Sequence, residues 1–289
     1  MENKTILVSG SNGQLGHALQ VLSSSTNYHF VFLTRDELNL ADPLSIAKVF
    51  ETYRPVYFVN CAAYTAVDKA ENDQQTAYTV NSEAVGEIAR QCAAFNTRLI
   101  HVSTDYVFNG RGEKPYVEDE KTDPVNYYGY TKWMGEKLAL ENNPATAVIR
   151  TSWVYSYHGN NFVKTMLRLM KERSEIRVVS DQVGSPTYAL DLAEAIIRII
   201  GSAEDNAAGF VPGIYHFSNQ GIISWYDFAC AIRDAAGLTC RVQPISTEEY
   251  PTPARRPGYS AMSITRISNT YGIPLKDWKL RLTECLKHL

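Results

Sequence analysis

Short apolar runs alternate with longer amphipathic stretches through the first half of the chain. The apolar runs end in polar or turn residues and predict strands at Thr5–Ser9, His29–Leu33, Val56–Asn60, Arg98–Ser103 and Thr146–Arg150. The stretches between them carry apolar residues three and four positions apart and predict helices at Gln14–Leu22, Leu44–Tyr53, Thr76–Phe95 and Tyr128–Glu141. Nearly all-apolar strands that alternate with helices indicate an α/β fold, a Rossmann-type doubly wound parallel sheet covered on both faces.

The alternation is looser after Arg150. The pattern predicts, in chain order, a helix at Asn161–Glu172, a strand at Ile176–Ser180, a helix at Asp191–Ile200 capped by Asp191, a flexible segment at Gly201–Gly213, a strand at Ile214–Phe217, a capped helix at Ser224–Ala236 and a proline-rich connection at Pro244–Tyr259. We expect a dinucleotide-binding domain over residues 1–153, with a segment near 187–201 returning to it. Residues 154–289 would form a smaller, discontinuous substrate-binding domain.

Charge and composition limit the kinds of partner. The 289 residues hold 28 Lys and Arg against 31 Asp and Glu, a net charge of −3, which disfavours nucleic-acid or membrane-surface binding. No apolar run reaches the roughly 18 residues of a membrane span, and residues 1–4 do not resemble a secretory signal. The five cysteines are scattered without a Cys-x-x-Cys pair, which favours neither a zinc site nor a disulfide framework. We expect a cytoplasmic protein.

Three glycines mark the junction of the first strand and the first helix. Gly10, Gly13 and Gly16 are spaced GxxGxxG, which differs from the GxGxxG of the usual dinucleotide fingerprint. Glycine at such a junction permits a tight turn, a close approach of backbone to a pyrophosphate, and close helix–strand packing. The positive end of the helix dipole then favours the phosphates. The position of the turn, more than the triplet itself, predicts a dinucleotide site.

The end of the second predicted strand bears on which nicotinamide cofactor binds. It reads Phe32-Leu33-Thr34-Arg35 and has no acidic residue there to accept hydrogen bonds from a ribose 2′-hydroxyl. Arg35 would instead pair with a 2′-phosphate, which favours NADPH, with NADH as the alternative. Asp36 beside it weakens this inference, and Arg35 as a solvated surface residue remains open.

Tyr128 and Lys132 lie four residues apart at the start of a predicted helix, so both project from one face. A free phenol has a pKa of about 10, and a neighbouring ammonium favours the phenolate. We therefore expect Lys132 to lower the pKa of Tyr128 toward a useful acid–base range. The spacing alone carries little weight in a chain with 18 tyrosines. Tyr127 and Tyr130 compete with Tyr128, but neither has a lysine four residues on.

The end of the fourth predicted strand supports a catalytic role for the tyrosine–lysine pair. The fourth predicted strand runs into Ser103-Thr104-Asp105-Tyr106, and strand ends carry the chemistry in open parallel sheets. The Thr104 hydroxyl would hydrogen-bond a substrate oxygen or the tyrosine. A role for Thr104 as a simple strand-end cap is the alternative.

These residues resemble a known family, the extended short-chain dehydrogenase/reductases, over nearly the whole chain. The matching segments are Gly10–Gly16, Asn60–Glu71 (NCAAYTAVDKAE), Ser103–Phe108 (STDYVF), Tyr128–Lys132 (YGYTK), Arg150–Tyr155 (RTSWVY), and Arg256-Pro257 with Ser260. Within the family they are similar to the members that reduce the C4 ketone of dTDP-4-dehydro-L-rhamnose to dTDP-L-rhamnose. The resemblance thus implies an NAD(P)H-dependent oxidoreductase whose partner is a dTDP-sugar, acting as a monomer or homodimer.

The resemblance also implies roles for individual residues. Tyr128 would donate the proton, Lys132 would be its partner and a ribose ligand, and Thr104 would tune the tyrosine. The substrate would be bound by Thr104, Asp105, Tyr128, Trp153 and, at the diphosphate, Arg256. The cofactor would be bound by Gly10, Asn12, Gly13, Gln14, Leu15, Gly16, Arg35, Asn39, Leu40, Ala62, Ala63, Thr65, Val102, Tyr128 and Lys132. For Arg256, a surface position in a proline-rich loop is the alternative.

Two features leave other functions open. Some relatives bind magnesium at a dimer contact through a glutamate on the first helix, but Ala18 matches that position here, so no metal is expected. The family also holds epimerases, reductases of other 4-keto sugars, and a non-catalytic regulatory subunit. Retention of Tyr128, Lys132 and Thr104 favours an enzyme.

Overall fold

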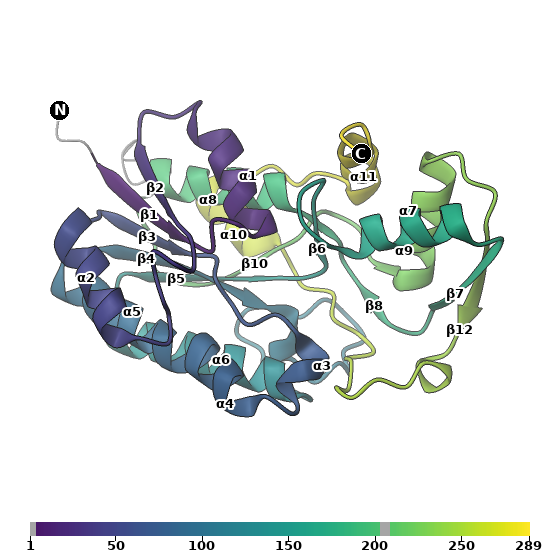
Figure 1. Cartoon of the computed structure of the whole chain (residues 1–289), viewed down its shortest axis with the longest axis horizontal. Coiled ribbons are helices and arrows are strands. Elements are labelled where there is room, and N and C mark those ends of the chain that lie inside the picture. The colour runs from purple at the N-terminus through teal and green to yellow at the C-terminus, as the bar shows by residue number, and fades with distance from the viewer. Residues whose placement is uncertain (1–3, 203–208) are drawn as a thin grey trace.

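The computed structural model describes residues 4–202 and 209–289. A large α/β body surrounds a central sheet, and a smaller group of helices and strands lies at one end of it (Figure 1). Residues 1–3 of the start that was expected not to be a secretory signal, and residues 203–208 of the predicted Gly201–Gly213 segment, lie outside the described residues.

The central sheet is parallel throughout, as predicted. Within the described residues it has six strands in the order β10-β5-β4-β3-β1-β2. Their bounds are β1 (Thr5–Ser9), β2 (His29–Leu33), β3 (Tyr57–Asn60), β4 (Arg98–Thr104), β5 (Thr146–Thr151) and β10 (Gly213–Phe217). Because β2 and β3 lie on opposite sides of β1, the connections reverse direction there, and such a switch point opens a crevice at the carboxyl ends of the strands.

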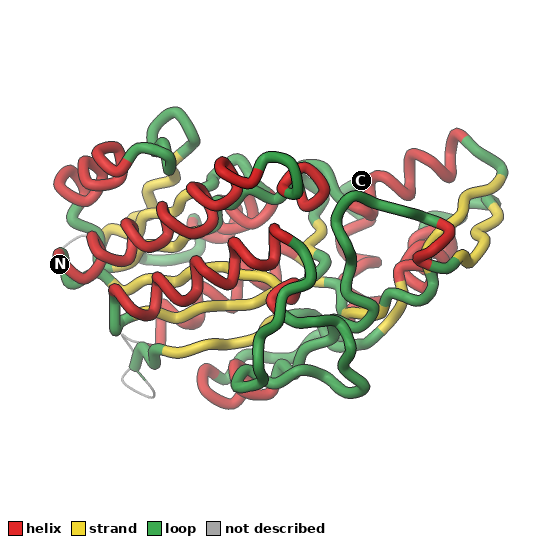
Figure 2. Tube along the Cα trace, turned by 90° about the horizontal axis from the view of Figure 1, so that it is seen from below, coloured by secondary structure: helices red, strands yellow, loops and turns green. Residues whose placement is uncertain are grey.

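Helices cover both faces of this sheet. One face packs against α2 (Pro43–Tyr53), α5 (Ala84–Ala94) and α6 (Tyr127–Asn142), and the other against α1 (Gln14–Ser23), α8 (Ala189–Ser202) and α10 (Thr265–Tyr271) (Figure 1). Seen from below in Figure 2, red helices cross in front of the yellow strands. Successive strand residues pack against opposite helical layers. Leu7 and Phe58 belong to the apolar core with α2 and α5, whereas Ile6 and Val59 belong to the apolar core with α1 and α8. Burial on both faces explains the all-apolar strands.

The helix predicted at Thr76–Phe95 is present over residues 74–94, but a π-helical turn that was not predicted lies within it. The chain forms α3 (Val67–Ala70), then α4 (Gln74–Tyr78), a π-helical turn at Thr79–Glu83, and α5. Asn81 in the π turn holds both the amide and the carbonyl of Tyr64, at 2.8 and 3.0 Å, and donates to the Thr131 hydroxyl at 3.1 Å. The π turn therefore joins the loop after β3 to α6, a tertiary requirement that the helical pattern does not reveal.

The smaller group of elements has its own apolar core, around Tyr155, Ile176, Phe228 and Leu282. It is built from α7 (Phe162–Glu172), β7 (Glu175–Val179), α9 (Trp225–Ala235), β12 (Arg241–Ile245) and α11 (Trp278–Leu286). Pro244 belongs to β12, where it pairs with Val178, and a 3₁₀ turn follows at Thr247–Glu249, so the predicted connection at Pro244–Tyr259 starts too early. An edge strand tolerates proline because its outward side needs no donor.

Several very short strands connect the two parts. They are β6 (Val154–Tyr155), which pairs with β9 (Thr187–Tyr188), and β8 (Val183–Gly184), which pairs with β11 (Ile223–Ser224). A 3₁₀ turn at Asp105–Val107 follows β4. Segments of two residues give no pattern in the sequence, so none of these strands was predicted.

Asp191 does not cap α8, contrary to the prediction. The helix begins at Ala189, and the Asp191 carboxylate is buried inside its first turn. There it accepts hydrogen bonds from Asn219 at 2.7 Å and from Lys276 and Arg281 at 2.9 Å each. An aspartate two residues into a helix looks like a cap, but here the C-terminal segments supply its partners.

The division into two domains remains a proposal. The C-terminal half contributes β10 to the central sheet and α10 to its helical layer, beyond the predicted return near 187–201. We propose that the larger domain includes these two elements. Among the described helices, none has the length and apolar character needed to cross a membrane.

Candidate active site

A cavity of about 910 Å³ opens at the carboxyl ends of the central strands. It is lined by every predicted site residue except Arg256, namely Gly10, Asn12, Gly13, Gln14, Leu15, Gly16, Arg35, Asn39, Leu40, Ala62, Ala63, Thr65, Val102, Thr104, Asp105, Tyr128, Lys132 and Trp153. Because Ser9 aligns with Asn60 in the sheet and Thr104 with Thr151, the strand ends that contribute to the cavity lie side by side.

The turn between β1 and α1 is shaped by glycine. Gly10 has φ of 71°, and a Cβ there would lie 2.8 Å from the Ala62 nitrogen. A Cβ on Gly16 would lie 2.7 Å from the Ser11 Cα. Neither position has space for a side chain, so the turn stays tight. The first-turn amides of α1 lack partners within the helix, and the turn therefore presents free donors beside the cavity.

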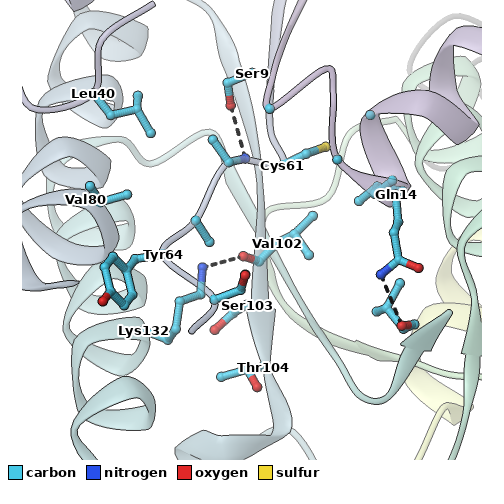
Figure 3. A pocket seen from close by; sticks show the side chains of 18 of the residues that line it. Ser9, Gln14, Leu40, Cys61, Tyr64, Val80, Val102, Ser103, Thr104 and Lys132 are labelled. Carbon is cyan, nitrogen blue, oxygen red and sulfur yellow. Dashed lines mark hydrogen bonds between the residues drawn. The ribbon is translucent and has the colours of Figure 1, made fainter. Parts of the chain in front are cut away.

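Lys132 reaches from α6 to the edge of β4 (Figure 3). Its ammonium donates to the Val102 carbonyl at 2.8 Å, and its Nζ lies 3.5 Å from His101 Nε2. Burial lowers the pKa of Lys132 to about 8, while the Glu136 carboxylate acts in the opposite direction. Burial also holds the pKa of His101 well below its usual value, so this imidazole is neutral and has a lone pair.

A line of buried polar side chains continues from Lys132 across three strands. Asn60 Nδ2 lies 3.1 Å from His101 Nδ1, and the Ser9 hydroxyl donates to Asn60 Oδ1 at 2.7 Å. The Ala62 amide donates to the Ser9 hydroxyl at 3.4 Å, and the dashed line from Ser9 in Figure 3 marks this bond. These bonds fix Lys132 relative to the glycine turn and the loop after β3.

The expected lowering of the Tyr128 pKa was wrong. Burial raises the pKa of Tyr128 to about 12, the hydrogen bond with the Thr104 hydroxyl acts in the opposite direction, and the Asp105 charge raises it further. Lys132 projects from the same helix, but its ammonium is bound to the β4 backbone. The phenol is therefore protonated at neutral pH, which suits a proton donor better than a base.

Asp105 is a buried carboxylate at the end of β4. Its Oδ1 accepts from the Thr104 hydroxyl at 3.0 Å, but within the described residues its Oδ2 has no hydrogen-bond partner. Burial raises its pKa to about 6, although nearby hydroxyls of Ser260 and Thr104 lower it. Because buried polar atoms are almost always paired, the free oxygen suggests a donor supplied by a ligand.

Arg256 lies outside the cavity lining. Its guanidinium forms a two-pronged ion pair with Asp68, with Nη2 donating to Oδ2 at 2.7 Å, and it also donates to the Ala254 carbonyl at 2.7 Å. Arg256, the residue predicted to bind the diphosphate, is thus paired with another part of the same chain. One link between Arg256 and the cavity is Tyr106, which lines the cavity and shares a hydrogen bond with Arg256.

The sequence missed other cavity residues. Trp225, the first residue of α9, stacks on Trp153, with ring centroids 3.6 Å apart and planes 12° apart. Gly159 and Asn160 reach the cavity from the loop before α7, and Cys61 from the loop after β3. Cys61 lies within the resembling Asn60–Glu71 segment, but no local signal marks the other three.

The chain is similar to known proteins over nearly its whole length. Residues 4–289 match the family model described as RmlD substrate binding domain. The spore coat polysaccharide biosynthesis protein SpsK of Bacillus subtilis (strain 168) is 42% identical over 282 residues, covering 98% of this chain and 96% of that protein. The dTDP-4-dehydrorhamnose reductase of Burkholderia thailandensis is also 42% identical, over 294 residues, covering 98% of each. The crystal structure of dTDP-4-dehydrorhamnose reductase from Bacillus anthracis str. Ames in complex with NADP is 36% identical and superposes with a TM-score of 0.94, over 99% of this chain and 100% of that one. The chain therefore belongs to the RmlD substrate-binding-domain family.

Proposed function

We propose that this chain reduces the C4 ketone of dTDP-4-dehydro-L-rhamnose to dTDP-L-rhamnose, with NADPH as the hydride donor and NADH as the alternative. The observation that carries this proposal is one cavity that joins the glycine turn to Thr104, Tyr128 and Lys132. The names of the Burkholderia relative and of the NADP-bound Bacillus anthracis structure support the same reaction and cofactor.

The glycine turn suits a dinucleotide because a Cβ at Gly10 or Gly16 would meet backbone. Gly13 and the first residues of α1, with Asn12 before them, would hold the pyrophosphate, and Gln14 and Leu15 would line its path. The adenine would lie near Asn39 and Leu40, with Arg35 at the 2′-phosphate. Ala62, Ala63, Thr65 and Val102 would line the nicotinamide end. When bound, the nicotinamide supplies a hydride.

Tyr128 would donate the proton as charge builds on the C4 oxygen. A pKa of about 12 keeps the phenol protonated at neutral pH, and an alkoxide is a stronger base than a phenolate, so the transfer runs downhill. Hydrogen bonds from Tyr128 and Thr104 strengthen as the oxygen becomes negative, and they therefore lower the barrier more than they tighten ground-state binding. Lys132, fixed on the Val102 carbonyl, would hold the cofactor ribose with its remaining N–H groups.

The substrate would lie beyond Tyr128, toward the smaller group of elements. Asp105 Oδ2, buried and without a partner among the described residues, would accept a hydrogen bond from a sugar hydroxyl. Trp153 would contact the sugar ring. A role for Arg256 at the diphosphate requires that it exchange Asp68 for phosphate oxygens, a change that phosphate would favour by its charge.

The test follows NADPH absorbance with dTDP-4-dehydro-L-rhamnose generated in situ and then identifies the sugar. Steady oxidation with dTDP-L-rhamnose as product is the expected result. Sugar conversion without net oxidation would instead indicate an epimerase. Failure on every 4-keto sugar, together with co-purification of a larger partner, would indicate a non-catalytic subunit.

A further inference from the structure

Trp225 forms one wall of the cavity together with Trp153. Both side chains are half-buried cavity residues, and their rings stack almost parallel at 3.6 Å. Phe162 lies against Trp225 with ring centroids 4.5 Å apart. The two tryptophans come from different parts of the fold: Trp153 precedes β6, and Trp225 begins α9.

The backbone fixes Trp153 in an unusual conformation. Its φ is 48°, in the left-handed region that bulky residues seldom adopt. The Ser152 hydroxyl donates to the Ser185 carbonyl at 2.6 Å, and the Thr187 amide donates to the Trp153 carbonyl at 3.2 Å. Gly184 lies so close to the indole that a Cβ there would come within 2.8 Å of Trp153 Cε2. Strain held by several contacts is typical of functional positions.

The position of Trp225 is also well determined. Ser224 and Asp227 form a reciprocal capping box, in which each side chain bonds the other residue's amide at 3.0 Å. Ser224 pairs with Val183 in the β8–β11 ladder, next to Gly184. The strand that contacts Trp153 therefore also anchors Trp225, and the two rings form a single rigid surface.

We infer that Trp225 is a specificity-determining residue for the sugar, and that the paired indoles form an apolar wall that selects a 6-deoxyhexose over a 6-hydroxyhexose. This inference rests on the proposed function. The parts of the two indoles that remain exposed to the cavity offer a C6 methyl group dispersion and burial, but they offer a C6 hydroxyl no acceptor. A hydroxyl buried there loses the water that accepted its hydrogen bond, and indole, which has only an N–H donor, cannot replace that acceptor.

L-Rhamnose is 6-deoxy-L-mannose, so dTDP-L-rhamnose and dTDP-L-mannose differ only at C6 and form a matched pair of ligands. Binding of both, and of dTDP alone, is measured by titration calorimetry on the full chain. We expect wild-type protein to prefer the rhamnose compound about tenfold, the usual scale for a single group in an apolar pocket. Trp225→Ala should reduce the preference to within about twofold and leave the affinity for dTDP unchanged, whereas Trp225→Phe should keep most of it.

Trp133→Phe is the matched control, because Trp133 lies on α6 and is outside the residues that line the cavity. The inference fails if Trp225→Ala keeps the wild-type preference, or if it weakens dTDP as much as dTDP-L-rhamnose. A different result would refute the proposed function itself. In that case, wild-type protein would bind dTDP-L-rhamnose no better than dTDP and would not oxidise NADPH.

Circular dichroism provides a second measurement that needs no substrate. Stacked indoles at this distance couple their electronic transitions, so the wild type should show an exciton couplet. Trp225→Phe and Trp153→Phe should each abolish it, and Trp133→Phe should keep it. A couplet that survives in Trp225→Phe, in a variant with normal thermal unfolding, would disprove the pairing.

Discussion

Replacing Asp105 by asparagine should shift the stability of the protein in favour of the variant as the pH rises. The side chain is 2% exposed, burial raises its pKa to about 6 from 3.8, and its Oδ2 has no partner among the described residues. A carboxyl whose pKa is higher in the folded than in the unfolded state is protonated preferentially when folded. Its stabilising effect is therefore complete below pH 3.8 and is lost as the pH rises through 6.

The size of the effect follows from the shift. With pKa values of 3.8 unfolded and about 6 folded, ionisation costs about 1.6 kcal/mol of unfolding free energy at pH 5 and about 3 kcal/mol at pH 8. Asparagine cannot ionise, so Asp105→Asn should gain about 1.4 kcal/mol relative to wild type between pH 5 and pH 8. Any change in hydrogen bonding to Thr104 adds a constant that cancels in this difference.

Urea unfolding of both proteins at pH 5, 6, 7 and 8 measures the effect directly. Asp119→Asn is the control, because Asp119 is an exposed carboxylate whose pKa is lowered by its hydrogen bond with Arg266. Its removal should bring no stabilisation that grows with pH. If the stability difference between Asp105→Asn and wild type were the same at pH 5 and pH 8, Asp105 would not be a buried carboxylate with a raised pKa, and the reasoning would be refuted.

Three further substitutions test the proposed site and its support. Tyr128→Phe should lose on the order of 100-fold or more in turnover while still binding NADPH, and near-normal turnover would show that the proton comes from elsewhere. Arg35→Ala should raise the KM for NADPH more than that for NADH, and an equal change would exclude Arg35 from the 2′-phosphate site. Glu136→Ala should reduce the unfolding free energy by about 3–5 kcal/mol, because it leaves the Arg150 guanidinium buried without its 2.7 Å partner. A loss below about 1 kcal/mol in urea unfolding would contradict that role.

Local sequence was enough to predict the larger part of the fold. The first five central strands were predicted within about a residue, since strands covered on both faces need continuous apolar runs. The π-helical turn at Thr79–Glu83 could not be predicted, because it depends on hydrogen bonds of Asn81 with Tyr64 and Thr131, which lie elsewhere in the chain. The bridging strands β6, β8, β9 and β11 depend on partners far away in the chain, and a two-residue segment carries no periodicity.

In the candidate site, too, some features could be predicted from local sequence and others could not. The glycine turn and the Tyr128–Lys132 spacing are local, and both reach the cavity. The pKa of Tyr128 depends on burial, on the Thr104 hydrogen bond and on the Asp105 charge, so a helical spacing of four could not predict the direction of its shift. Trp225 was missed because it stands at an ordinary helix start, and it reaches Trp153 through the β8–β11 pairing of segments far apart in the chain.

The proposed cofactor and sugar regions are also tied to each other, through Gln14. Its Nε2 donates to the Val154 carbonyl at 3.3 Å, the bond that the dashed line from Gln14 marks in Figure 3, and its Oε1 accepts from Asn161 at 2.9 Å. Asn161 in turn caps α7 by accepting from the Lys164 amide. A residue of the glycine turn thus holds the segment that follows Trp153, so the turn and the indole wall cannot shift independently. Hydride transfer requires a fixed distance between a bound nicotinamide and a sugar carbon, and reacting atoms about 1 Å out of place can cost about 100-fold in rate. The Gln14 bridge gives the fold a means of setting that distance before either ligand binds.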